Sequence, residues 1–347
     1  MSRKHYPVQF TGTGGEYFAI WIVNIALTLL TLGIYSAWAK VRTLRWFYGH
    51  TLIDGQAFAY LATPLQILKG RLIALAALVA YYAATYFAPM LALLFLLALF
   101  AALPWIVVSS LRFHARMSAY RGLRFDFTGT VGEAARIYVG LQLLFIPTLG
   151  LILPYLAYRQ VRFIVDHTVY GQTSARYRGT LKPFWSVYLL AFALMLLPLA
   201  IVVYGFYQAY VLQAAGLPKE MVTAATAGTV GLGFLLFYLM IPVVSAFVMA
   251  RTANLLYNAS ELGPVGFDCN QRARDMIWLY LSNLVLIALT VGLFIPWAKV
   301  RLARYRARRL AVNGPQDLGQ FVAGQQQQSH ATGSEMADLF DLNIGLT

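Results

Sequence analysis

The residues in this chain that could take part in catalysis are few and far apart. Its five histidines form no metal-ligand spacing such as His-Glu-x-x-His, and its single cysteine, Cys269, excludes an internal disulfide framework and a multi-cysteine metal site. The sequence also lacks a P-loop and a Gly-x-Ser-x-Gly motif. We therefore expect no enzymatic activity, no cofactor and no bound metal.

Two histidines and two glutamates occupy corresponding places in the sequence. His50 and His167 each precede a threonine, and Glu16 and Glu133 each precede a long apolar segment. They could be symmetric, proton-responsive or ligand-contacting groups. The alternative is structural, with each histidine bonded to a nearby turn and each glutamate complementing the positive end of a helix dipole. The residue types favour the structural role.

The composition is that of a membrane protein. Hydrophobic residues make up 60% of the chain and charged residues 12%, whereas soluble domains have roughly 25% charged residues. Leu72–Val108, Trp185–Leu217 and Met221–Ala250 contain no charge, and about 20 apolar residues suffice to cross a bilayer. Because no signal peptide is visible, we expect a multi-pass protein of the bacterial inner (cytoplasmic) membrane.

The net charge of +14 comes from basic residues that follow the apolar segments. Short cytoplasmic loops collect Lys and Arg, so we expect the basic loops and the C-terminus to be cytoplasmic. The same charges can contact anionic lipid. We expect membrane lipids, mainly anionic ones, as partners. Gly-x-x-x-Gly-type contacts are compatible with a homo-oligomer, and we expect no nucleic acid.

The chain repeats itself. Residues 10–51 align without a gap on residues 127–168, and a third copy matches at Asn283, Thr290 and Trp297–Arg301. We call this repeat unit A, at about 10–60, 127–180 and 269–313. Pairs of apolar segments between the copies form unit B, at about 65–126 and 184–268. The order A-B-A-B-A describes a single repeated transmembrane domain over 1–313, and a mostly disordered polar tail follows over 314–347.

These patterns predict an all-α polytopic membrane protein with small cytoplasmic β elements. Asp54-Gly55 between two β-prone runs is a hairpin signal. Each unit A has a Thr-x-Gly break, and three breaks at one depth would create a polar spot in lipid. The candidate pore or break residues are Thr31, Gly33, Thr148, Gly150, Thr290 and Gly292.

An aromatic residue and then basic residues follow each break, as in an amphipathic helix at headgroup level. The candidate lipid or interface residues are Trp38, Lys40, Arg42, Arg45, Tyr155, Arg159, Arg162, Trp297, Lys299, Arg301 and Arg304. Whether the A segments cross or re-enter stays open. Full crossing would invert the middle copy, as in transporter folds, but would put its basic residues outside. The charge bias favours re-entry.

The motif Phe10–Phe18, with Asn24, Leu30–Tyr35 and Trp38–Arg42, resembles the YjgN-like family of bacterial inner-membrane proteins. The resemblance runs from Phe10 to about Arg309. It implies location and architecture, but it transfers no binding residues because the family's function is unknown. Two functions stay open. One is a small-solute channel or carrier. The other is a non-transporting membrane protein that binds anionic lipid or partner proteins through its basic-aromatic cytoplasmic face.

Overall fold

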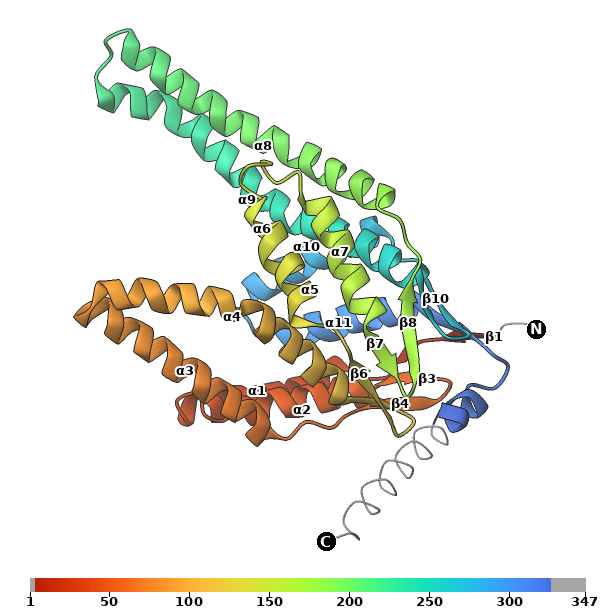
Figure 1. Cartoon of the computed structure of the whole chain (residues 1–347). Coiled ribbons are helices and arrows are strands. Elements are labelled where there is room, and N and C mark those ends of the chain that lie inside the picture. Colours follow the sequence, from red (N-terminus) through yellow and green to blue (C-terminus); the bar gives the residue numbers. More distant parts are fainter. Residues whose placement is uncertain (1–3, 326–347) are drawn as a thin grey trace. The chain divides into compact units, whose positions relative to one another are not determined.

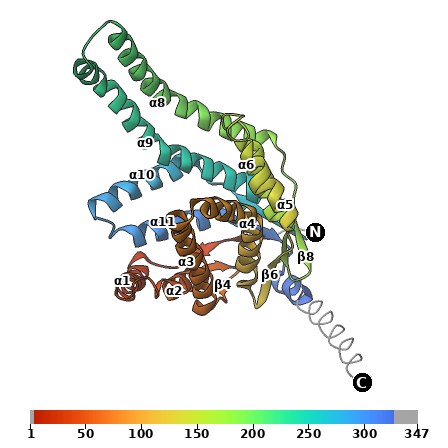
Figure 2. The same cartoon turned by 60° about the vertical axis from the view of Figure 1, so that its left-hand side comes forward.

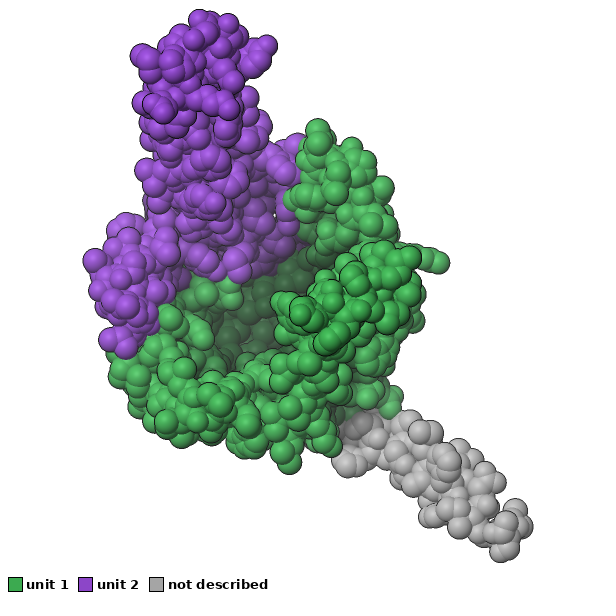
Figure 3. All heavy atoms as spheres, turned by 90° about the vertical axis from the view of Figure 1, so that its left-hand side faces the viewer, with its two compact units in different colours: residues 1–179, 256–269, 295–347 green, residues 180–255, 270–294 purple. Residues whose placement is uncertain are grey.

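The computed structural model describes residues 4–325 (Figure 1). The chain divides into two compact units, and each is described by itself (Figure 3). The first unit comprises residues 1–179, 256–269 and 295–347, and the second comprises residues 180–255 and 270–294.

The first unit contains all eleven strands of the described chain. They are β1 (Lys4–Pro7), β2 (Gln9–Phe10), β3 (Thr51–Ile53), β4 (Gln56–Tyr60), β5 (Ser118–Tyr120), β6 (Leu123–Phe127), β7 (Thr168–Tyr170), β8 (Thr173–Tyr177), β9 (Ser260–Leu262), β10 (Val265–Cys269) and β11 (Leu310–Gly314). Its helices are α1 (Gly14–Leu30), α2 (Ser36–Gly49), α3 (Pro64–Phe87), α4 (Pro89–Arg116), α5 (Val131–Ala135), the π-helical η1 (Arg136–Gly140), α6 (Leu141–Leu143), α7 (Leu153–Asp166) and α11 (Ile295–Arg308).

The strands form one antiparallel sheet that curls into a nearly closed barrel. Their order is β1-β11-β10-β9-β8-β7-β6-β5-β4-β3-β2. Only Val8 separates β1 from β2, and its backbone N–H donates to the Leu310 carbonyl at 3.0 Å, so the two ends of the sheet meet. Tyr120 and Tyr170 are buried on one face of their strands, whereas Arg124 is exposed on the other. The barrel therefore has an apolar interior.

The prediction of an all-α fold with small β elements is wrong. The hairpin expected at Asp54-Gly55 is present, with both residues in the left-handed region (φ 51° and 72°) that a two-residue hairpin loop requires. However, the strands of separate hairpins also pair with one another, as in Phe58 with Tyr120. These pairs form across entire helical segments. A strand of two to five residues gives only a weak local signal, so the sequence shows isolated hairpins and not their closure.

Helical segments leave the barrel and return to it. After β2 the chain forms α1 and α2, and α2 leads into β3, which pairs with β2. The α1–α2 pair is therefore a helical hairpin with both ends at the barrel. The α3–α4 hairpin similarly connects the paired strands β4 and β5. Figure 2 shows these hairpins from a second direction.

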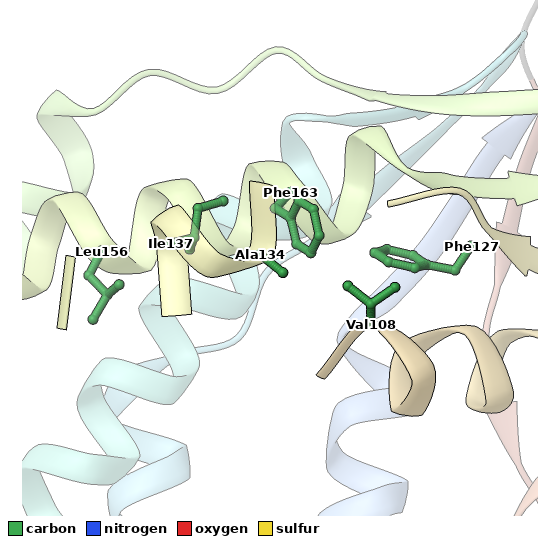
Figure 4. Close-up of a cluster of buried hydrophobic side chains, with 6 residues drawn as sticks. All are labelled: Val108, Phe127, Ala134, Ile137, Leu156 and Phe163. Atoms are coloured by element: carbon green, nitrogen blue, oxygen red, sulfur yellow. The ribbon is translucent and has the colours of Figure 1, made fainter. Parts of the chain in front are cut away.

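The segment from α5 to α7 surrounds a buried cluster next to the barrel (Figure 4). Phe127 of β6 meets Phe163 of α7 with ring centroids 5.4 Å apart, and Val108 of α4 lies in the same cluster. A side chain at Gly129 would collide with both phenylalanine rings. The close approach at this glycine lets the strand and the helix share one core.

The second unit is helical in the described chain. It contains α8 (Lys182–Ala214), most of α9 (Lys219–Asn258) and α10 (Ala273–Leu289). Gly205 lies against Val230, and Gly233 lies against Val202, so α8 and α9 pack closely as a long hairpin (Figure 1). Across residues 4–325, four helices are long and apolar enough to cross a membrane by length and composition, namely α3, α4, α8 and α9.

Candidate functional site

The Thr-x-Gly breaks form closed turns at the ends of the short helices. The Thr31 hydroxyl donates to the Leu27 carbonyl at 2.7 Å and accepts from the Tyr35 backbone N–H at 2.9 Å. Gly33 has a φ of 91°, and its N–H donates to the Thr28 carbonyl at 2.7 Å. One hydroxyl thus bonds both arms of the turn.

The other two turns have the same hydrogen bonds. The Thr148 hydroxyl donates to Leu144 at 2.6 Å and accepts from Ile152 at 3.3 Å. In the second unit, the Thr290 hydroxyl donates to Leu286 at 2.7 Å, and the Phe294 N–H donates to it at 3.0 Å. Every hydrogen bond named here stays within its own turn. The proposed pore or ligand role of these sites stays a prediction.

The tips of the three turns are apolar and almost fully exposed. The residue between the threonine and the glycine is 95% exposed at Leu32, 89% at Leu149 and 93% at Val291. Each has a φ of 49°, in the left-handed region that non-glycine residues rarely adopt. These turns expose apolar side chains while their polar groups bond internally, which is the arrangement that a hydrocarbon environment requires.

Several candidate interface residues hold the fold together. Arg45 donates to the Ala62 carbonyl at 2.9 Å, and Arg304 donates to the Gly12 carbonyl at 2.9 Å. Ala62 lies in the loop after β4, and Gly12 lies in the loop after β2. Arg162 pairs with Asp166 at 3.1 Å.

The aromatic members of the motif pack against neighbouring rings. Trp38 stacks on Tyr35 at 6.2 Å, Trp297 lies 4.9 Å from the ring of Phe18, and Arg159 donates to the Tyr155 hydroxyl at 3.2 Å. Arg42 is exposed and Arg301 is partly buried.

Lys40 and Lys299 are placed differently. Both are exposed, and within residues 4–325 neither ammonium group forms an ion pair or hydrogen bond. They line one pocket of about 430 Å³ between α1, α2 and α11. Asn24 also lines this pocket and is only 5% exposed.

The recurring histidines and glutamates lie together at the barrel ends of their helices. His50 Nε2 is 3.9 Å from Glu16, and His167 Nε2 is 3.4 Å from Glu133. The Nδ1 atoms lie 2.7 Å from the Trp46 carbonyl and 2.9 Å from the Phe163 carbonyl. Glu16 also completes a capping box at the start of α1. These are the contacts of the structural interpretation.

The barrel encloses an apolar chamber of about 570 Å³, which is lined by residues such as Phe58, Tyr120 and Tyr170. The Tyr120 hydroxyl donates to the Ile53 carbonyl at 2.8 Å, and the Tyr170 hydroxyl donates to the Tyr120 carbonyl at 2.9 Å. Burial raises the pKa of both hydroxyls, and it raises that of Tyr177 to about 12. The chamber is not apparent from the sequence because it exists only once the barrel closes.

Residues 318–325 are helical, and Leu318, Phe321 and Val322 line the chamber. This segment belongs to the part of the chain for which a disordered polar tail is expected. Gly314, the first residue of that part, is the last residue of β11. The remainder, residues 326–347, lies outside the described residues.

Comparison with known proteins gives related membrane proteins of unknown function. The family described as "Bacterial protein of unknown function (DUF898)" matches residues 5–339. The inner membrane protein YjgN of Salmonella typhimurium (strain LT2) is 26% identical over 358 residues, which cover 91% of this chain and 90% of that relative. YjgN of Escherichia coli K12 is 31% identical over 136 residues, or 37% of this chain and 32% of the relative. No solved structure matches.

The family match covers almost the entire chain, and the Salmonella relative aligns over nine-tenths of it. Both agree with the resemblance that the Phe10–Phe18 motif and its continuation indicate. The chain belongs to the DUF898 family of bacterial proteins and is a relative of the YjgN proteins.

Proposed function

We propose that this protein is a multi-pass inner-membrane protein that binds anionic phospholipid at a face built from its short helical hairpins. One observation carries the proposal: the hairpin tips are apolar and almost fully exposed, and after two of them comes a lysine, Lys40 or Lys299, that has no ion pair or hydrogen bond within the described residues. Apolar groups at hydrocarbon depth with cations at headgroup level are typical of interfacial elements. The inner-membrane names of the relatives support the location.

The dimensions of the α1–α2 hairpin suit insertion into one leaflet. α1 has 17 residues and is about 25 Å long at 1.5 Å per residue, which is short of the roughly 30 Å hydrocarbon core. Both ends of the hairpin lead into the paired strands β2 and β3. Lys40 lies about 6 Å along α2 from Ser36, the first residue of that helix. On the proposed insertion, the lysine would lie closer to the lipid headgroups than the apolar tip at Leu32 does.

The long hairpins α3–α4 and α8–α9 would cross the bilayer and return. Their ends lead into barrel strands, so every connection to the barrel would lie on one side. The bias of Lys and Arg toward cytoplasmic loops makes that side the cytoplasm, together with the C-terminus. Units A and B would then be variants of one internal repeat, a helical hairpin followed by a β-hairpin.

The proposal is tested on the purified full-length protein in a non-ionic detergent. We expect phosphatidylglycerol to raise its melting temperature more than phosphatidylcholine with the same acyl chains does. The difference should shrink at high salt, because screening weakens charge interactions at the surface. Equal stabilisation by the two lipids would contradict the proposal.

Solute transport is the other function that the sequence suggests. It would require a polar path, and flux assays in proteoliposomes decide it. Solute flux that is lost on Thr31→Val would favour a channel or carrier.

A further inference from the structure

The pocket between α1, α2 and α11 combines two positive charges with an unsatisfied buried acceptor. Lys40 and Lys299 supply the charges, and the residues that line the pocket include no carboxylate. Asn24 is only 5% exposed. Within the described chain, its Oδ1 atom accepts no hydrogen bond. Its amide nitrogen donates to the Ala39 carbonyl at 3.5 Å, which assigns the unpaired atom as the carbonyl oxygen.

The sequence copies link the asparagine to the lysine. The first unit A carries Asn24 with Lys40, and the third carries Asn283 with Lys299 at the corresponding positions. The middle copy has Leu141 and Ala157 in their places, so both polar residues are absent together. The asparagine and the lysine of the first copy both line the pocket, and the copy that lacks one of them also lacks the other.

The chemistry of these groups defines the ligand. Two ammonium groups favour an anion, and a phosphodiester satisfies them. A phosphodiester has no proton to donate to Asn24 Oδ1, so the ligand must also carry a donor. An ammonium donor, as in ethanolamine, would be repelled by the two lysines, whereas a neutral hydroxyl would not. The ligand is therefore an anionic phosphodiester with a hydroxylated substituent.

We propose that this pocket binds the headgroup of an anionic phospholipid that bears a free hydroxyl, with phosphatidylglycerol as the model ligand. Lys40 and Lys299 bind the phosphate, and Asn24 accepts from the headgroup hydroxyl. The exposed apolar residues Leu29 and Leu30 on α1 offer a surface for acyl chains, which favours a lipid over a soluble phosphate ester. This inference rests on the proposed lipid binding and assigns its site and specificity.

The test compares two lipids of equal charge on the full-length protein in detergent, by titration and melting temperature. Phosphatidylglycerol and phosphatidylmethanol share the phosphodiester, but only the first has free hydroxyls. We expect the wild type to bind phosphatidylglycerol several-fold more tightly. Lys40→Gln with Lys299→Gln should weaken both lipids about equally. The matched pair Lys69→Gln with Lys182→Gln, also exposed lysines, should leave binding unchanged.

Asn24→Leu, which keeps the side-chain volume, should abolish the preference for phosphatidylglycerol while phosphatidylmethanol still binds. If this variant does not fold, the lysine variants and the wild-type preference still decide the proposal. Equal wild-type affinity for the two lipids would overturn the hydroxyl-specific site and leave anionic-lipid binding intact. A loss of all preference over phosphatidylcholine would overturn the proposed function as well.

Soluble glycerophosphoglycerol distinguishes the source of the phosphodiester. We expect it to compete at least tenfold more weakly than the lipid, because it lacks acyl chains. Equal competition would overturn the assignment to a lipid. Equal weakening by the Lys69/Lys182 control pair would show a general charge effect and would overturn the pocket as the site.

Discussion

The threonine at each of the three hairpin turns combines a hydroxyl group, which bonds to both arms of the turn, with an apolar methyl group. Its hydroxyl donates to the carbonyl one turn earlier and accepts from an amide of the next helix. The methyl group can remain in contact with an apolar environment. If the turns insert into the leaflet as proposed, an unpaired amide there would cost several kcal/mol, and a residue that supplies an acceptor for it is favoured.

This role can be measured with matched threonines of the second unit. Thr290 donates to Leu286 and accepts from Phe294, whereas Thr223 only donates, to Lys219 at 2.8 Å. Thr290→Val should lower the free energy of unfolding by about 1 kcal/mol more than Thr223→Val, because it also removes the hydrogen bond that the Phe294 amide donates to the hydroxyl. Thermal or denaturant unfolding in detergent measures the difference. Equal losses would show that the second bond contributes nothing.

At the scale of elements, three helices are each tied by a side chain to the residues at the end of the β-hairpin that follows them. Arg45 bonds to the carbonyl of Ala62, and Arg112 bonds to those of Phe127 and Gly129 at 3.1 and 3.3 Å. In the second unit, Asn254 bonds to the Gln271 carbonyl at 2.9 Å. Three of these contacts share a sequence separation of 17 residues. The side chain therefore sets where the chain leaves the sheet.

Arg112→Met should destabilise the protein by about 1.5–3 kcal/mol, because bonds from a charged donor to two carbonyls are lost while most of the packing volume stays. Arg42→Met is the control, since Arg42 is exposed and forms no hydrogen bond or ion pair within the described chain. Its effect should stay within about 0.5 kcal/mol. A similar loss of stability in both variants would indicate a general effect of removing a positive charge, and not the loss of the Arg112 hydrogen bonds.

Some of these elements are visible in the sequence and others are not. The turns at Thr31 and Thr148 and the Asp54-Gly55 hairpin follow from local residue types. The basic motif is equally visible in the sequence. The sequence does not show, however, that Arg45 bonds to a backbone carbonyl whereas Lys40 has no ion pair or hydrogen bond within the described residues. Which arginine meets a carbonyl depends on loops that lie far along the chain. The sequence therefore locates the candidate site without separating its structural residues from its ligand-binding residues.

At the scale of the whole chain, the two ends of the sheet meet and nearly close the barrel. β1 pairs with β11, and His5 Nδ1 lies 2.8 Å from Asn313 Oδ1. The periodicity of such short strands could not predict this pairing, because its partners are about as far apart in sequence as the chain allows. The pairing of β1 with β11 determines whether the sheet has open edges.

Closure can be tested by cross-linking in a Cys269→Ala background. His5→Cys with Asn313→Cys should form a disulfide, because facing residues of antiparallel strands have suitable Cα separations. After cleavage at a protease site inserted at Gly216, the two fragments should stay joined until reduced. His5→Cys with Glu261→Cys, which lie on different fragments and on strands that are not neighbours, should not join them. Separate fragments from the first pair would mean that the barrel is open.

The joining of β1 to β11 also has a consequence for biosynthesis. β1 is translated before β11, so it cannot find its partner until all the helices and strands between them have been made. Until Leu310–Gly314 has been translated, β1 and β10 would each keep an unpaired edge, and such edges are sites for aggregation and proteolysis. Protection of these two edges must therefore follow the synthesis of every strand between them.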